Sequence, residues 1–226
     1  MYAACIANHA LLFRGDDLMV AGVRLNQAWD VAFSANCHWL IVGTDAGAVP
    51  LHLTNSDLVP ARHHNAGSAV FSVATCPLSP TLFYTGTRDG RFTTHDTRQP
   101  KPVAALPEQP SAVCVLQVPE SSQPEVLCGT MAGTLRLYDV RHATAPIRMF
   151  DGAPLTHRTR NGDVTLGWQP GLLAASDETC TVFWSWDHAA PLIALPRPGA
   201  SLRASAHHMS LLCPTDNGVD IVSAIY

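Results

Sequence analysis

Two arginines stand at matching positions of a repeated motif in this chain of 226 residues. One motif reads His-Asp-Thr-Arg and ends at Arg98, and the other reads Tyr-Asp-Val-Arg and ends at Arg141, 43 residues later. Arginine presents a planar, charged fork that makes several charge-assisted hydrogen bonds, and it is enriched among the residues that dominate protein–protein binding. We therefore predict that Arg98 and Arg141 bind a protein partner, supported by Asp96 and Asp139. The alternative is that each arginine only pairs with the aspartate of its own turn.

The other polar residues show no pattern that is typical of metal binding or catalysis. Two of the 11 histidines form the pair His63-His64 and two more form His207-His208. Neighbouring residues of a strand point to opposite faces, so such a pair rarely chelates one ion. The sequence lacks Cys-x-x-Cys, Gly-x-Ser-x-Gly, His-Glu-x-x-His and a phosphate-binding glycine loop before a helix. We therefore expect no metal, no cofactor, no small-molecule substrate and no enzymatic activity.

The two arginines belong to a longer repeat whose turns are marked by glycine. Gly-Thr-x-x-Gly stretches begin at Gly43, Gly86 and Gly129, 43 residues apart each time, and related turns begin at Ala175 and Pro214. Nine residues after the start of each of the first four turns comes a ring: His52, His95, Tyr138 and Trp184. A period near 43 with strand–turn–strand content predicts an all-β fold, a β-propeller of WD repeats with ~40–45 residues per blade. Trp184 stands at the position where such repeats pack a tryptophan between blades.

The repeat predicts a single domain of about five recognisable four-stranded blades. The units lie near residues 26–65, 66–108, 109–153, 160–198 and 200–226. The last unit lacks an outer strand, and residues 10–25 supply further strands that close the ring if residues 18–25 complete the fifth unit. The alternative is a shortened propeller, open or completed by a partner, because a ring of seven blades at this period needs ~300 residues.

Composition restricts the classes of partner and compartment. The formal net charge is −4 and no run of basic residues exists, which argues against direct nucleic-acid binding. Only 14% of residues are charged, against about 25% in an average soluble domain, so either part of the surface is covered in a complex or the chain is simply rich in alanine and proline. No apolar stretch reaches the ~20 residues of a membrane span, and a secretory leader is not recognisable. The seven cysteines predict free thiols and a cytoplasmic or nuclear location.

The two Asp-x-Arg motifs resemble the paired WDxR-type boxes of cullin-4 ubiquitin ligase substrate receptors, with His95 and Tyr138 in place of the usual tryptophan. Residues 82–98 and 131–152 resemble one subfamily of cullin-4-associated factors, number four in the usual naming, and the similarity covers roughly residues 28 to 198. In that family the two arginines dock on the propeller adaptor of the ligase, and another surface presents the substrate. The resemblance implies a non-catalytic receptor. The alternative is a structural scaffold subunit of a large multiprotein or ribonucleoprotein assembly, which the low charge density and the incomplete ring favour.

Overall fold

The computed structural model contains only strands and their connections in the part of the chain that it describes. That part consists of residues 2–6, 8–14, 18–54, 57–118, 124–142, 144–153, 163–166, 172–176, 180–195, 201–205, 208–215 and 218–224. No helix within these ranges is long and apolar enough to cross a membrane.

The strands form six antiparallel sheets, each built from strands that follow one another in the chain. The first sheet holds β1 (Tyr2–Ile6), β2 (His9–Arg14) and β3 (Leu18–Arg24). The second sheet holds β4 (Ala28–Phe33), β5 (Trp39–Thr44), β6 (Gly47–Leu53) and β7 (Leu58–Pro60). The third sheet holds β8 (Val70–Thr75), β9 (Leu82–Thr87), β10 (Phe92–Asp96) and β11 (Ala104–Ala105).

The last three sheets continue this pattern. The fourth sheet holds β12 (Val113–Gln117), β13 (Glu125–Thr130), β14 (Leu135–Asp139) and β15 (Arg148–Phe150). The fifth sheet holds β16 (Asp163–Leu166), β17 (Leu172–Ser176), β18 (Thr181–Ser185) and β19 (Pro191–Leu195). The sixth sheet holds β20 (Ser201–Ser205), β21 (His208–Thr215) and β22 (Gly218–Ala224).

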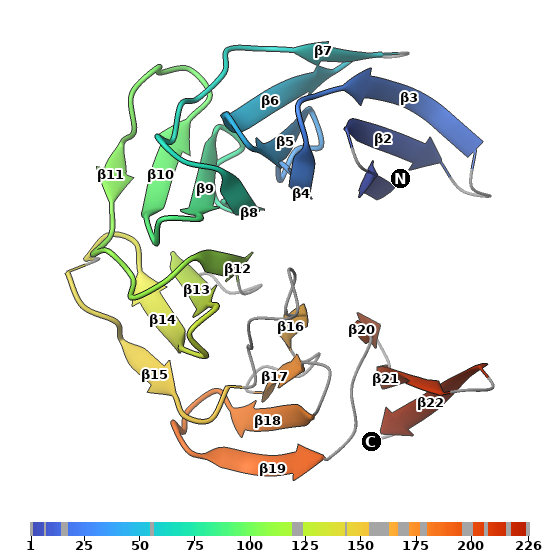
Figure 1. The fold of residues 1–226 in the computed structure, drawn as a ribbon, viewed down its shortest axis with the longest axis vertical. Coiled ribbons are helices and arrows are strands. Elements are labelled where there is room, and N and C mark those ends of the chain that lie inside the picture. Colours follow the sequence, from blue (N-terminus) through green and yellow to red (C-terminus); the bar gives the residue numbers. More distant parts are fainter. Residues whose placement is uncertain are drawn as a thin grey trace.

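The sheets follow one another around an open ring (Figure 1). The first strand of each sheet lies innermost and contacts the first strand of the next sheet, from β1 through β4, β8, β12 and β16 to β20. Tight hairpins join the strands, so each sheet forms from local pairings, as the Gly-Thr-x-x-Gly turns predict. The all-β propeller architecture predicted from the repeat is confirmed.

The core lies between neighbouring sheets rather than in one central cluster. Tyr84 and Phe92 of the third sheet pack against Tyr138 of the fourth, and all three side chains are buried. Trp184 is buried between the fourth and fifth sheets, where its Nε1 donates a hydrogen bond to the Asp151 carbonyl over 2.9 Å. The predicted tryptophan between blades is therefore present. The strand β10 is buried along its whole length, although four of its five residues, Thr93, Thr94, His95 and Asp96, are polar.

Side-chain hydrogen bonds also join the inner strands of three successive sheets. The Asp30 carboxylate on β4 accepts from Ser72 Oγ at 3.0 Å and from the Val73 N–H at 2.8 Å, both on β8. Ser72 Oγ in turn accepts from the Leu116 N–H on β12 at 2.9 Å. Burial raises the pKa of Asp30, although hydrogen bonds from the Val73 and Val31 N–H groups and from Ser72 Oγ favour its charged form. Polar bonds therefore tie each of these inner strands to the next.

The first full repeat unit differs from the others in the length of its hairpin. Strand pairing places Leu51, His95, Tyr138 and Trp184 at the same position of their sheets. His52 instead pairs with Trp39 and occupies the position that Asp96 holds in the next sheet. The ring of His52, nine residues after Gly43, therefore does not occupy the sheet position of His95, Tyr138 and Trp184. The turn after Gly43 is one residue shorter than the turn after Gly86, so the following strand is shifted by one residue and its faces are exchanged.

The N-terminal strands form a sheet of their own, so the described part contains six sheets rather than five. Completion of the fifth unit by residues 18–25 was one of two alternatives for the ring, and the structure differs from it, because β3 pairs with β2 and lies in the first sheet. The physical reason is the upstream strand Tyr2–Ile6, which pairs with β2 through a short turn and makes a local three-stranded meander. The sixth sheet keeps three strands, with β22 at its edge in the described part.

Candidate functional site

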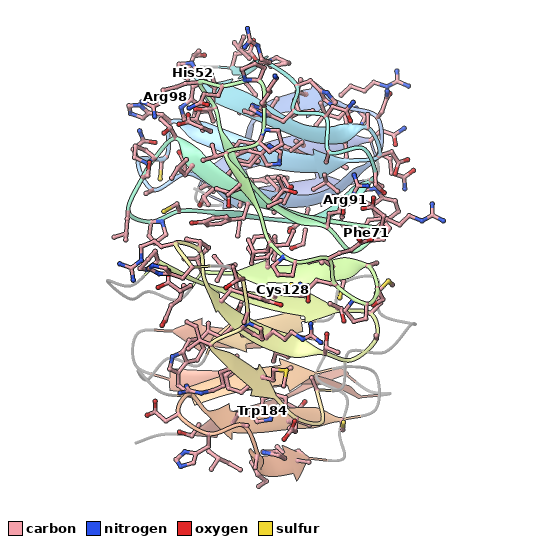
Figure 2. All side chains as sticks on the ribbon, turned by 90° about the vertical axis from the view of Figure 1, so that its left-hand side faces the viewer. His52, Phe71, Arg91, Arg98, Cys128 and Trp184 are labelled. Carbon is pink, nitrogen blue, oxygen red and sulfur yellow. The ribbon has the colours of Figure 1, made fainter. Side chains whose placement is uncertain are left out.

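Both candidate arginines follow the third strand of a four-stranded sheet. Asp96 ends β10 opposite Leu82, the first residue of β9, and Asp139 ends β14 opposite Glu125, the first residue of β13. These matching registers put both arginines at the same edge of the ring. Figure 2 shows Arg98 and His52 at this edge, which we call the Arg98 rim. Arg91 and Phe71 lie at the opposite edge, the hairpin rim, where the Gly-Thr-x-x-Gly turns lie.

Arg98 is held by a two-pronged ion pair with the aspartate of its own turn. Its Nε lies 3.0 Å from Asp96 Oδ1 and its Nη2 lies 2.7 Å from Asp96 Oδ2. The backbone N–H of Arg98 also donates to Asp96 Oδ1 over 2.9 Å, which fixes the turn. These hydrogen bonds lower the pKa of the buried Asp96 carboxyl. The Arg98 side chain itself remains 71% exposed, so the pair orients the guanidinium without covering it.

Arg141 repeats the same arrangement on the next sheet. Its Nε lies 3.1 Å from Asp139 Oδ1, its Nη2 lies 2.8 Å from Asp139 Oδ2, and its side chain is 57% exposed. Hydrogen bonds from Arg141 lower the pKa of Asp139 to about 2. His142 Nδ1 approaches the same carboxylate at 3.7 Å. The local pairing that the sequence left open as an alternative is therefore present, and it leaves both guanidinium groups accessible at the rim.

The sheets on either side do not carry this motif. In the second sheet, His52 takes the aspartate position. In the fifth sheet, Ser185 takes it, and Ser185 Oγ accepts from the Asp187 N–H over 3.3 Å in a similar turn. An acidic residue, Asp187, therefore stands where Arg98 and Arg141 stand. Among the four-stranded sheets that the structure describes, only the two middle ones present arginine at this rim.

Each of the two sheets that carry an arginine also has an exposed apolar residue before its outer strand, Val103 in the third sheet and Ile147 in the fourth. The repeat in the sequence did not predict these two residues. The Val103 N–H donates to the Thr94 carbonyl and the Ile147 N–H donates to the Leu137 carbonyl, each over 2.8 Å. Both residues lie where the chain enters the outer strand, and each is 51% exposed. Their positions in the sequence, after each Asp-x-Arg motif and just before the outer strand, could have indicated that both residues are exposed.

Two histidines form a buried pair between the second and third sheets. His64, in the connection between these sheets, has its ring 5.4 Å from that of His95. His95 stacks on Phe83 at 5.0 Å, and its Nε2 lies 3.0 Å from Thr85 Oγ1. The other ring nitrogens of the pair have no hydrogen-bond partner among the described residues. Burial lowers the pKa of both groups, that of His95 to about 4.

The same place between the third and fourth sheets holds a fully bonded pair. Gln109 Nε2 donates to the Tyr138 hydroxyl at 3.0 Å, and Arg136 Nη1 donates to Gln109 Oε1 at 3.1 Å. In both places a residue of the segment between two sheets contacts the third strand of the following sheet. The residues that make this contact differ from one repeat to the next. In the part of the chain described, no three histidine, cysteine or acidic side chains gather in a group able to hold a metal ion.

Comparisons with known proteins identify the fold. No family model matches the sequence, and no curated protein matches it. Among solved structures, a chain in the crystal structure of a mitotic checkpoint complex superimposes with a TM-score of 0.74 at 17% sequence identity. The match covers 99% of this chain and 76% of that chain. Together with the six consecutive antiparallel meanders, this likeness identifies the fold of the chain as that of a WD-repeat β-propeller.

Proposed function

We propose that this chain is a non-catalytic protein-interaction module whose Arg98 rim docks on the propeller adaptor of a cullin-4 ubiquitin ligase. In this role it is a substrate receptor that holds a second protein near the ligase, in the nucleus or the cytoplasm. The observation that carries the proposal is the repeated geometry of Arg98 and Arg141. Each guanidinium is fixed by its own aspartate and exposed at the same rim.

The geometry supports docking because the arginines are already oriented. A flexible arginine loses rotamer freedom when it binds, which costs about 0.5–1.5 kcal/mol for each immobilised side chain. Bonds to Asp96 and Asp139 hold the two side chains in place before any partner arrives. Val103 and Ile147 add exposed apolar surface where each of these sheets enters its outer strand. Arginine is enriched among the residues that dominate an interface, and the surface around such residues helps to exclude water.

Replacing both arginines with alanine is expected to weaken adaptor binding about 30-fold or more, since a hot-spot residue contributes at least ~2 kcal/mol. The measurement is a binding titration of the Arg98→Ala/Arg141→Ala variant against purified adaptor. The fold should be retained, because the backbone N–H of residues 98 and 141 still donates to each carboxylate, although the buried Asp96 loses its side-chain partner at some cost in stability. A thermal melt of each variant checks this.

The matched control is the Arg88→Ala/Arg91→Ala variant. It also removes two exposed arginines, but from the hairpin rim. Adaptor binding by this control should equal that of the natural chain. If the two double variants bind the adaptor equally, or if the natural chain does not bind it, the proposed docking function is wrong.

A scaffold subunit of a larger assembly is the second candidate function. The observation that favours it is that, in the described part of the chain, the first and sixth sheets each have three strands and the sheets form an open ring. Exposed sheet edges promote association with further strands. Affinity purification of the tagged chain should then recover one fixed set of subunits with the natural chain and with the Arg98→Ala/Arg141→Ala variant alike. A monodisperse monomer that melts cooperatively would count against this candidate.

A further inference from the structure

The inner strands carry a repeated irregularity at the hairpin rim. The pairing of β4 with β5 shifts between Ala28 and Asp30, and the pairing of β8 with β9 shifts between Val70 and Ser72. Each shift is a bulge, which places one extra residue in the strand and re-aims its side chain. The extra residues are Trp29 and Phe71. They stand at the inner side of the ring, because β4 and β8 are innermost, and Figure 2 shows Phe71 at the hairpin rim.

The two aromatic side chains meet beside a carboxylate. The rings of Trp29 and Phe71 lie 5.1 Å apart and cross at 63°. Trp29 Nε1 donates to Asp45 Oδ1 over 2.7 Å, which fixes the carboxylate of this exposed residue against the indole. Both rings remain partly exposed. An aromatic pair set at an angle and an oriented carboxylate therefore share one place on the hairpin rim.

Among the described residues, no cation is paired with Asp45, in contrast to the aspartate of the next hairpin. Asp89 lies in the matching turn of the third sheet, where it accepts from Thr87 and pairs with Arg91 at 3.3 Å. For Asp45, no basic side chain of the described residues lies within ion-pair distance. The carboxylate beside Trp29 is thus available to an incoming cation, whereas the carboxylate of Asp89 is already paired.

We propose that Trp29, Phe71 and Asp45 bind a lysine side chain of a protein segment. A cation over an aromatic face is attracted by the ring, most strongly by tryptophan, and a nearby carboxylate adds Coulomb attraction. One Asp45 oxygen is taken by the Trp29 indole. The remaining oxygen suits an ammonium group, which needs a single acceptor, better than a guanidinium, whose planar fork calls for two.

This lysine site is separate from the docking function proposed for the Arg98 rim. It lies on the hairpin rim, at the opposite edge of the ring in Figure 2. A chain bound through Arg98 and Arg141 would therefore keep the lysine site open for a second protein. The two proposals fail independently, because Asp45→Asn should leave adaptor binding unchanged and Arg98→Ala/Arg141→Ala should leave lysine binding unchanged.

The test is a titration of the whole chain with blocked tripeptides, followed by the indole N–H resonances in a nitrogen–proton NMR spectrum. The resonance of Trp29 is assigned from its loss in Trp29→Phe. A peptide with central lysine is expected to shift this resonance and to leave that of Trp39, at the other rim, in place. Two further peptides carry norleucine or arginine in place of the central lysine. Norleucine keeps the alkyl chain without the charge, so its peptide should bind at least about 5-fold more weakly than the lysine peptide. The arginine peptide should bind no more tightly than the lysine peptide.

Two isosteric variants make the result specific. Asp45→Asn keeps an acceptor for the Trp29 indole and removes the charge, and it should weaken lysine binding about 2- to 5-fold, as expected for loss of an exposed ion pair. Asp89→Asn makes the same change at the already paired carboxylate and should have no effect on lysine binding. The proposal is overturned if the norleucine peptide binds as tightly as lysine, if the arginine peptide binds more tightly, if both variants behave alike, or if Trp29 does not respond.

Discussion

Replacing Gly90 with alanine is expected to lower the free energy of unfolding by about 2–5 kcal/mol, a large share of the total for a single domain. Two effects add together. Gly90 has a φ of +87°, where an L side chain costs about 1–2 kcal/mol. A methyl group there would also lie 2.6 Å from the Gln109 carbonyl oxygen, and such overpacking costs about 1–3 kcal/mol. The clash is with the connection that leads to the fourth sheet.

Gly152 provides the matched control for this substitution. It also has a positive φ, +69°, but no atom lies within 4 Å of the added methyl group. Gly152→Ala should therefore lose only the backbone contribution of about 1–2 kcal/mol. Urea unfolding of both variants gives the difference directly. Equal losses in the two variants would show that close approach between the hairpin and the next connection is not what requires glycine at position 90.

Acidification from pH 6.5 to pH 4 is expected to cost about 3 kcal/mol of stability through His95. Burial lowers the pKa of His95 in the folded chain to about 4, whereas the unfolded chain takes up this proton near pH 6.5. Between these values only the unfolded state is protonated, so stability falls as the pH falls. His64 acts in the same direction, because burial and the charges of His63 and Arg62 lower its pKa, against the opposing charge of Asp96.

The next sheet supplies the variant that tests this acid sensitivity. We design a triple variant that carries, between the second and third sheets, the residue types found at the matching positions between the third and fourth sheets. It combines His64→Gln, Phe83→Val and His95→Tyr. The matching residues are Gln109, Val126 and Tyr138. The natural chain and this triple variant share all other titrating groups, including Asp30, whose raised pKa acts in the opposite direction.

Urea unfolding at pH 6.5 and pH 4 is the measurement for the histidine pair. The triple variant should lose less stability on acidification than the natural chain, and the exposed-histidine variant His38→Gln should lose as much as the natural chain. An unchanged pH dependence in the triple variant would mean that His64 and His95 are not responsible for the acid sensitivity.

The blade architecture was predictable because the repeat encodes local structure. Glycine turns at a constant spacing fix each hairpin, and hairpins assemble into meanders without long-range information. The burial of Trp184 followed from its place in the repeat. The one-residue shift at His52 was not predictable, because the turns after Gly43 and Gly86 look alike in sequence and differ only in how many residues their loops contain. The strand at residues 2–6 was missed because its alternation is weak.

The candidate site was predictable in its residue types but not in its surroundings. The spacing of Asp96 and Asp139 from their arginines indicated local pairing, and the structure contains it. The exposed partners Val103 and Ile147 lie in loops that the repeat does not constrain. The meeting of Trp29 with Phe71 depends on two bulges in separate sheets, 42 residues apart. Contacts between sheets depend on side-chain direction, which periodicity alone does not determine.

The bonds between inner strands also have a consequence for synthesis on the ribosome. Asp30 receives two of its hydrogen bonds from residues 42 and 43 positions later, and Ser72 receives one from a residue 44 positions later. At about 5–20 residues per second, each interval takes on the order of seconds. During that time the strands of the second sheet can already pair with one another. The Asp30 carboxylate, however, is bonded only to water and to the N–H of its neighbour Val31. The second blade is therefore bonded to the third, and the third to the fourth, only after the later blade has been synthesised.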